Sequence, residues 1–359
     1  MGRNLVLCFD GTNNKYAATN TNVVKLYAML DRTREDQLCY YQTGIGTFLP
    51  AGTWGKLKRW YLTKLDLAVA WLLEDHVCDG YRFLMRYYQP GDQIYIFGFS
   101  RGAYTARVLA AMLYKVGLLS EGNEEMISFA WDMFKGERDY AIYSDFRHTF
   151  SRSVKVKFLG LWDTVSSVGW VWNPIHLQFT EQNPFVEVIR HAVALDERRA
   201  SFMQNLWSTK IDEKNGQDVQ QVWFSGVHCD IGGGYSEAEA GLSKITLKWM
   251  QGHAEAFGLY FYPLSVSIIL PEQDTSKYVS PSATAMLHES LQGWWWIAEY
   301  VPKRIQDPSL NFEARWILHG GCHRYVSDGA MIHSTVFERM EKCASYKPPN
   351  LPVSYKITR

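Results

Sequence analysis

The chain has no excess of charge of either sign. Its 359 residues hold 37 lysines and arginines against 37 aspartates and glutamates. A protein that holds a nucleic-acid backbone or an anionic bilayer by its overall field needs a strongly basic surface, and this composition does not supply one. We therefore expect no nucleic-acid partner, and any lipid or polymer has to be bound locally.

Long hydrophobic runs and paired cysteines are also scarce. The longest apolar runs, such as 67–73, fall far below the ~20 residues that span a bilayer, so no integral membrane association is expected. The run from Leu5 to Phe9 is too short for a secretory signal and no small-residue cleavage site follows it. The six cysteines are dispersed and form no C-x-x-C pair. These absences predict a cytoplasmic protein with reduced thiols, although leaderless secretion would escape this test.

The residues that are present predict an α/β fold. Short runs rich in Val, Ile and Phe alternate with amphipathic stretches, which is typical of a mostly parallel central sheet flanked by helices. Buried strands are predicted at 5–9, 93–97, 156–161 and 221–224, and helices at 65–88 and 103–116. We expect one domain over 1–359, with a core of about 1–240 and with lid or insertion segments at 120–150 and 274–315.

Polar or glycine-containing turns follow the four predicted strands. They begin at Asp10, Gly98, Trp162 and Gly226. Ligand-handling groups in an open α/β sheet gather at the carboxyl ends of the strands. The four turns are therefore expected to share one edge of the sheet, and the chemistry is expected there.

The segment 98–102 fits G-x-S-x-G, the turn that presents a nucleophilic serine between a strand and a helix. This pattern predicts Ser100 as the nucleophile, with a helix N-cap as the alternative role. The amide of Arg101 would donate to an oxyanion, and Gly11 or Thr12 could supply a second donor. An ordinary turn after the first strand is the alternative for that second position.

A serine nucleophile needs a histidine base and a carboxylate that orients the imidazole. Asp163 and His228 each follow a predicted strand, in the chain order that this fold class uses. Asp163 could instead cap a helix. Asp230 is the reserve carboxylate, or orients a neighbouring loop, and His333 is the reserve base.

A short cluster of metal-binding residue types lies at His319, Cys322 and His323, but its spacing does not match a structural zinc site. We interpret it as incidental and expect no cofactor. The segment 294–300 contains Trp294, Trp295, Trp296 and Tyr300 and would suit a lid or an acyl-binding wall. Buried packing is the alternative explanation for these aromatic residues.

Two other functions fit the same residues. Oxygen-rich strand ends suit divalent ions, so Asp10, Asp163, His228 and Asp230 could be the metal ligands of a phosphoester hydrolase. The fold could also be a catalytically inactive binding module. Serine-directed labelling separates both alternatives from a serine hydrolase.

Five ordered motifs resemble a known family. They lie at 9–12, 98–104, 161–165, 190–199 and 226–235. Together they are similar to the largely uncharacterised α/β-hydrolase domain family that includes the phospholipase effectors of type VI secretion. The resemblance covers about Leu5 to Tyr235 and continues more faintly to His333.

The resemblance implies the set Ser100, Asp163 and His228, in agreement with the choice made from the residues alone. It also implies a carboxylic ester hydrolase of lipase or phospholipase type, acting on an ester or lipid-like small molecule. It predicts nothing about oligomeric state. Arg198 and Arg199 could hold a carboxylate or phosphate, or could brace the loops that carry Asp163 and His228.

Overall fold

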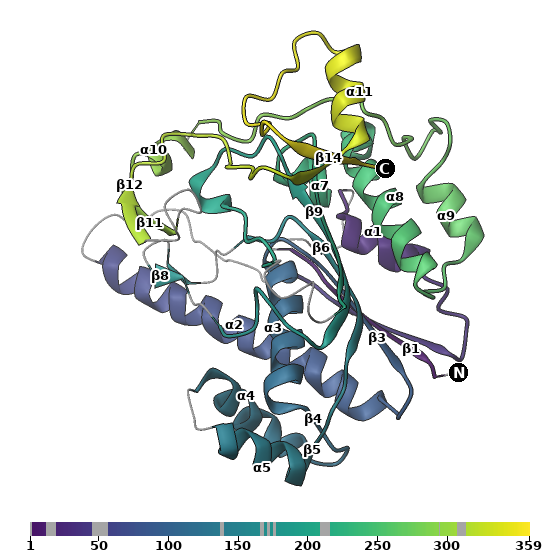
Figure 1. The fold of residues 1–359 in the computed structure, drawn as a ribbon, viewed down its shortest axis with the longest axis vertical. Helices are drawn as coiled ribbons and strands as arrows, with labels where there is room; N and C mark the ends of the chain where they lie inside the picture. Colours follow the sequence, from purple (N-terminus) through teal and green to yellow (C-terminus); the bar gives the residue numbers. More distant parts are fainter. Residues whose placement is uncertain are drawn as a thin grey trace.

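A single eight-stranded sheet forms the centre of the molecule (Figure 1). The computed structural model describes residues 2–11, 19–44, 57–136, 140–165, 169–170, 173–174, 177–208, 216–293, 295–306 and 314–359. Within these ranges the strand order is β14-β13-β10-β9-β6-β3-β1-β2, and each neighbouring pair is parallel. The chain leaves β1 toward β2 and returns on its other side as β3, so the strand order reverses beside β1, the point where ligands bind in open α/β sheets.

The strands of this sheet include the four predicted ones. They are β1 (Asn4–Phe9), β2 (Gln37–Gln42), β3 (Gln93–Phe99), β6 (Val156–Trp162), β9 (Val186–Ala194), β10 (Asp218–Phe224), β13 (Ala330–His333) and β14 (Tyr355–Thr358). The predicted strands correspond to β1, β3, β6 and β10, while β2, β9, β13 and β14 were not predicted. Short ribbons pair β4 (Leu118–Leu119) with β5 (Ser151–Arg152), β7 (Gly169–Trp170) with β8 (Asn173–Pro174), and β11 (Lys303–Gln306) with β12 (Ala314–Ile317).

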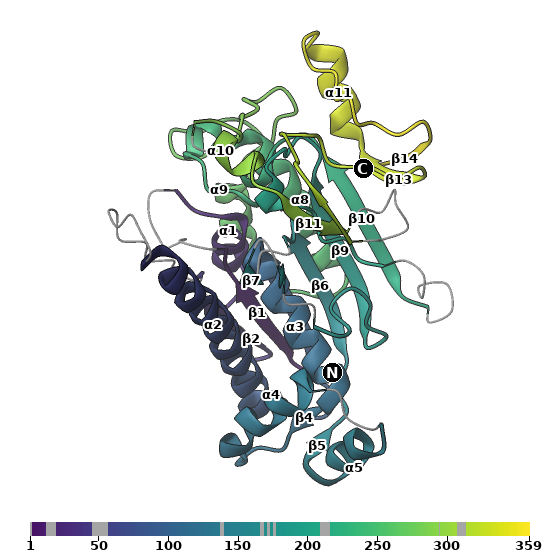
Figure 2. The same ribbon diagram turned by 90° about the vertical axis from the view of Figure 1, so that its left-hand side faces the viewer.

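Helices cover both faces of the sheet. One face is covered by α2 (Leu57–Tyr87) and α3 (Arg101–Val116), and α4 (Ile127–Lys135) and α5 (Tyr140–Phe150) pack on these two helices. The other face is covered by α1 (Asn22–Met29) and α8 (Gly241–Ala256), and α9 (Pro263–Ile269) packs against α1. Figure 2 shows α2 and α3 side by side in front of the sheet. In β1, Leu5 and Leu7 belong to the hydrophobic cluster on the α2 and α3 side of the sheet, while Val6 and Cys8 belong to the cluster on the α1 and α8 side. Burial on both faces explains why the strands are continuous apolar runs.

Three further helices follow β10 in the chain. They are α7 (His228–Gly232), α10 (Trp295–Glu299) and α11 (Ser334–Lys342). Among the described residues, no helix has the length and apolar character to pass through a lipid bilayer.

The segment 120–150 lies at the far end of α3 from Ser100. It forms α4 and α5, at the lower end of the molecule in Figure 1. Lys115, near the C-terminal end of α3, donates to the carbonyls of Phe134 and Gly136 at 2.8 Å and holds this insertion in place. The described residues of this segment therefore lie away from Ser100, and the roles of 120–150 and 274–315 as lid or insertion segments stay predictions.

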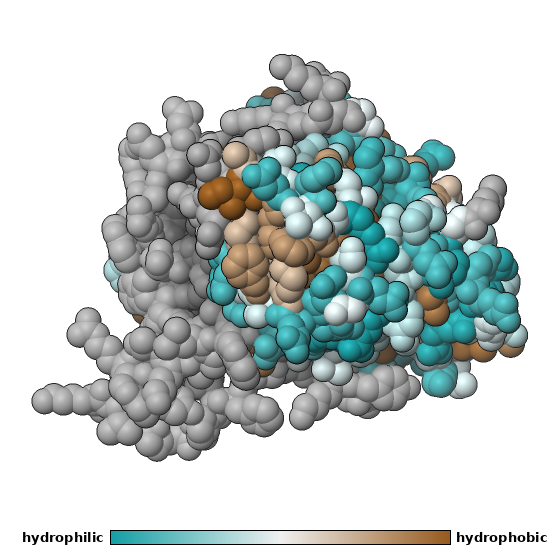
Figure 3. All heavy atoms as spheres, turned by 90° about the horizontal axis from the view of Figure 1, so that it is seen from below, coloured by the Kyte–Doolittle hydropathy of each residue, from teal (hydrophilic) through white to brown (hydrophobic). Residues whose placement is uncertain are grey.

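Hydrophobic side chains are exposed on this insertion. Phe129 of α4 and Ile142 and Phe150 of α5 all reach the surface. Figure 3, seen from below, shows a cluster of hydrophobic residues within a described surface that is mostly hydrophilic. Because α4 and α5 lie away from the strand ends that carry the predicted site, this surface has no part in it.

The turn between β3 and α3 brings three backbone segments unusually close together. A Cβ atom at Gly98 would lie 2.4 Å from the carbonyl oxygen of Gly102, and one at Gly102 would lie 2.3 Å from that of Phe9. Ser100 between them has φ 59° and ψ −122°, a strained conformation for a residue with a side chain. The two glycines of G-x-S-x-G are therefore required by contact between α3, β3 and β1.

Replacing Gly102 with alanine is expected to destabilise the protein by about 1–3 kcal/mol, since the new methyl group meets backbone that cannot move aside. The matched control is Gly252→Ala in α8, where nothing lies within 4 Å of the added Cβ. That change should instead stabilise the helix by about 0.5–1 kcal/mol. Urea unfolding of both variants measures the difference, and equal effects would contradict this account of the turn.

Candidate active site

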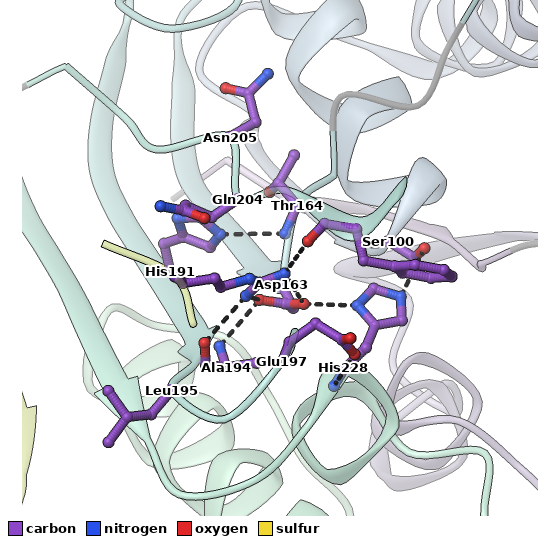
Figure 4. Close-up of polar contacts among 12 residues, drawn as sticks. Ser100, Asp163, Thr164, His191, Ala194, Leu195, Glu197, Gln204, Asn205 and His228 are labelled. Carbon is purple, nitrogen blue, oxygen red and sulfur yellow. Dashed lines mark hydrogen bonds and ion pairs between the residues drawn. The ribbon is translucent and has the colours of Figure 1, made fainter. Parts of the chain in front are cut away.

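Three predicted side chains meet at the carboxyl edge of the sheet (Figure 4). Ser100 follows β3, Asp163 follows β6, and His228 opens α7 after β10. The Nε2 atom of His228 lies 2.9 Å from the Ser100 Oγ, and its Nδ1 atom lies 2.6 Å from Oδ2 of Asp163. All three side chains are buried. The arrangement links a hydroxyl, an imidazole and a carboxylate in one continuous chain of hydrogen bonds.

The His228 ring is held from several sides. It lies 4.6 Å from the Phe99 ring and 4.8 Å from the Phe202 ring, centroid to centroid. An ionised carboxylate can only accept, so the contact with Asp163 puts the ring hydrogen on Nδ1. The lone pair of Nε2 then faces the Ser100 hydroxyl, the geometry that a general base requires.

Asp163 is fully buried and bound on both carboxylate oxygens. Arg324 donates to Oδ1 at 2.6 Å and to Oδ2 at 3.0 Å, and the Ala194 amide donates to Oδ1 at 2.9 Å. Burial by itself would raise the pKa of Asp163, but the charge of Arg324 and the hydrogen bond with His228 hold that pKa well below its usual value. The carboxylate is therefore ionised at neutral pH.

The motif at 190–199 lies on β9 and the loop after it, between the turns that carry Asp163 and His228. His191 accepts from the Thr164 amide through Nε2 at 3.2 Å, next to Asp163. The carboxylate of Asp196 accepts from the Gly226 amide at 2.6 Å, just ahead of α7. The motif thus connects the turn after β6 to the turn after β10.

The Glu197 carboxylate accepts a hydrogen bond from the His228 backbone and so holds the start of α7 in place. Its Oε2 atom accepts from the His228 amide at 3.2 Å and from Arg199 Nη2 at 2.9 Å, and Ser290 donates to Oε1 at 2.9 Å. Burial opposes ionisation of Glu197, but the hydrogen bond and charge of Arg199 outweigh it and lower the pKa to about 2.

Of the two arginines in the motif, Arg199 braces this loop. Its guanidinium pairs with Glu197 and lies 3.7 Å from the Phe202 ring centroid. Arg198 donates to the carbonyl of Gly321 at 2.8 Å. Both side chains are therefore engaged with the loops around Asp163 and His228.

The predicted oxyanion donors differ in their surroundings. Arg101 is the first residue of α3, where an amide has no acceptor within the helix. The Gly11 amide instead donates to Oδ1 of Asp10 at 2.7 Å, so a ligand oxygen would have to displace that bond. Thr12 lies outside the described residues. Asp10 also accepts from Thr21 at 2.8 Å and from Tyr41 at 2.7 Å, so its carboxylate connects the end of β1 to the start of α1 and to β2.

The reserve residues do not contact Ser100. Asp230 accepts from His288 Nδ1 at 2.7 Å, and this contact connects the segment 274–293 to α7. The contact fits the alternative role of Asp230, in which it orients a neighbouring loop. His333 caps α11 and stacks on Phe224 with a centroid distance of 4.5 Å. The base nearest to the serine is His228.

Two groups of residues were considered as possible metal ligands: the cluster at 319–323 and the four residues of the phosphoester-hydrolase alternative. His319 pairs with Glu299 at 2.8 Å, and Cys322 is exposed. Within the described ranges, no three His, Cys, Asp or Glu side chains are grouped so that they could hold a metal ion. Of the four residues of the phosphoester-hydrolase alternative, Asp163 and His228 contact each other, whereas Asp10 and Asp230 have the other partners described above.

Sequence reasoning missed the residues that hold the three central ones. Arg324 follows Gly320 and Gly321 in a turn and belongs to no recognisable motif. Phe202, against the His228 ring, lies in a short 3₁₀ turn. A Cβ at Gly232 would lie 2.0 Å from the Phe99 ring, so a glycine at this position lets α7 pack closely against Phe99.

Comparison with known proteins gives one family and one curated relative. The sequence profile of the T6SS phospholipase effector Tle1-like catalytic domain matches residues 3–253. The uncharacterized protein YEL023C of Saccharomyces cerevisiae is 42% identical over 221 residues, which cover 56% of this chain and 32% of that protein. The chain thus spans about a third of the length of this relative.

Two solved structures are also similar. A crystal structure of an uncharacterized protein from Pseudomonas aeruginosa has a TM-score of 0.45 and 20% identity, and covers 78% of this chain and 49% of that one. The structure of the Tle1 effector bound to the VgrG spike of the type 6 secretion system has a TM-score of 0.40 and 18% identity, and covers 67% of this chain and 52% of that one.

Glu197→Gln tests the support beneath His228. The folded-state pKa of about 2 lies below the usual 4.5, so Glu197 stabilises the fold fully above about pH 4.5 and loses this effect as pH falls toward 2. We expect E197Q to lose about 2–3 kcal/mol at pH 7 and to show a smaller further loss between pH 5 and pH 3 than the wild type. Urea unfolding at each pH measures this.

The control for that measurement is Glu338→Gln, which removes a carboxylate from an exposed pair with Lys342. It should leave stability near the wild-type value. An E197Q protein as stable as the wild type at pH 7 would show that Glu197 does not support the loop.

Proposed function

The chain belongs to the T6SS Tle1-like phospholipase effector catalytic-domain family, and on that basis we propose that it is a serine hydrolase of carboxylic esters. The observation that carries the proposal is the position of His228, which contacts the Ser100 hydroxyl at 2.9 Å and the Asp163 carboxylate at 2.6 Å. Lipase or phospholipase activity is the activity that the family suggests.

In the proposed mechanism, His228 takes the proton of the Ser100 hydroxyl while Oγ attacks the ester carbonyl carbon. Asp163 accepts from Nδ1–H and stabilises the imidazolium that results. The strained turn at Ser100 fixes Oγ at the strand end, so little reorientation is needed before attack. His228 then gives the proton to the leaving alcohol, and the acyl group stays on Ser100.

Charge that develops on the carbonyl oxygen needs donors that are already in place. The Arg101 amide at the start of α3 is one, aided by the positive end of the helix. Gly11 could become the second if its amide leaves Asp10 when a substrate oxygen arrives. Water activated by His228 then attacks the acyl-enzyme and releases the acid.

The substrate class follows from the aromatic surface beside His228. Phe202 contacts the His228 ring and also lies 5.6 Å from the Trp295 ring of α10. Beyond Trp295, Ile297 is 59% exposed and Tyr300 is 66% exposed. Aromatic rings next to the imidazole and exposed apolar side chains further along the same segment suit contact with an acyl chain, so we assign α10 as part of the acyl-binding wall.

We also propose that residues 1–359 form a single α/β domain, because β13 and β14, near the end of the sequence, belong to the same sheet as β1.

A cytoplasmic location stays a prediction from the sequence.

Ser100→Ala is expected to lower turnover of p-nitrophenyl esters at least about a thousandfold, because the attacking oxygen is removed. It should also abolish labelling by a fluorophosphonate, with the modified peptide in the wild type mapping to Ser100. Ser243→Ala is the matched control, since Ser243 is also buried but bonds to the Ala240 carbonyl in α8. Undiminished turnover or labelling in S100A would overturn the proposal.

The role of α10 and of Tyr300, the residue after it, is tested by Ile297→Ser with Tyr300→Ser. If these side chains bury themselves in lipid, their loss should lower hydrolysis of phospholipid vesicles about tenfold, which corresponds to about 1.4 kcal/mol of apolar burial. Hydrolysis of a short water-soluble ester should change less than about twofold. The control is Leu264→Ser on α9, which is 58% exposed on another helix. Equal losses on both substrates would argue against a lipid-contacting role.

A further inference from the structure

Arg324 reaches Asp163 from a part of the chain that lies beyond the matched family region. It belongs to the segment between β12 and β13, whereas the family profile matches 3–253. Its side chain is 2% exposed and binds both oxygens of Asp163, at 2.6 and 3.0 Å. No step of the proposed mechanism uses this guanidinium.

We propose that Arg324 is a positioning residue of the proposed hydrolase, which fixes the plane of the Asp163 carboxylate and tempers the negative charge that this carboxylate presents to His228. The inference rests on the proposed function, because it gives Arg324 a role only if His228 acts as the base toward Ser100.

The geometry supports the positioning role. A two-pronged guanidinium contact fixes the orientation of a carboxylate, which a single donor does not. Arg324 is itself held by the carbonyls of Ala194 and Phe202, and the Ala194 amide also binds Asp163. The same residues that hold the guanidinium therefore lie against the carboxylate and the imidazole.

The charge of Arg324 supports the second part of the role. In the proposed mechanism the Asp163 charge stabilises the positive charge that His228 carries after it takes the Ser100 proton, and a cation on the far side of the carboxylate weakens that attraction. Other ionisable groups around the pair are Arg107 of α3 against His191 of β9, Glu197 and Arg199 on the loop after β9, and Cys229 and Asp230 of α7. Burial lowers the pKa of His191 to about 3, so it stays neutral across the working range. Arg324 is thus the cation in direct contact with Asp163 in the described residues.

Arg324→Met removes the charge and the two-pronged contact but keeps much of the apolar volume. We expect kcat toward a soluble ester at pH 8 to fall about 10- to 100-fold, and the midpoint of the acid limb of the pH–rate profile to rise by about one pH unit. The matched control is Arg339→Met, because Arg339 is a buried arginine of the same C-terminal segment that donates to the carbonyls of Ala283 and Ala285 instead.

A lower kcat with an unshifted midpoint in R324M, or an equal shift in R339M, would overturn the proposal and leave Arg324 a purely structural residue. If R324M does not fold, Arg324→Lys provides the test, since it keeps the positive charge but loses the two-pronged contact with Asp163. It should keep the wild-type midpoint with a kcat lowered about tenfold, and a wild-type kcat or a shifted midpoint overturns the proposal.

The pH dependence of fluorophosphonate inactivation gives the same midpoint independently of any ester. It also separates the two proposals. Failure of the wild type to label at Ser100 would overturn the proposed function, whereas a labelled wild type with an unshifted R324M profile would overturn only the role of Arg324.

Discussion

Asp163 holds a carboxylate with none of its surface exposed, and an ionised group in that position requires compensation from its neighbours. Three separate stretches of chain provide it: the Arg324 guanidinium, the Ala194 amide at the end of β9, and the His228 ring that opens α7. The backbone of Asp163 is itself strained, with φ 38°. The turn after β6 is therefore stable only when the loops around it are in place, which ties the position of the histidine to the packing of this whole edge.

The sequence predicted the fold where its information is local. β1, β3, β6 and β10 are apolar runs followed by polar turns, and the glycines of the serine turn mark a close contact of backbones. β9 was missed because Arg190 and His191 interrupt its apolar character. Those two side chains find polar partners in Asp218 and Gln221 of β10, about 30 residues later. No pattern within β9 itself reports those partners.

The three central residues of the candidate site were predicted for a similar reason, since each follows a strand in a recognisable motif. Their catalytic role stays a prediction. The residues that hold them were not found, because Glu197 and Arg324 act through contacts across 31 and 161 residues of sequence. The expected second oxyanion donor also shows this limit. The sequence indicated Gly11 as a possible donor, but not that its amide already donates to Asp10.

The distance along the chain between Asp163 and Arg324 has a consequence for biosynthesis. A growing chain is made from its N-terminus, and an all-parallel sheet forms slowly because its strand pairs are distant in sequence. A nascent chain that has reached His228 already contains the hydroxyl, the carboxylate and the imidazole, but the cation that offsets the buried charge is still to be synthesised. The edge of the sheet that carries Asp163 can therefore reach its compensated form only after the segment that carries Arg324 has been synthesised.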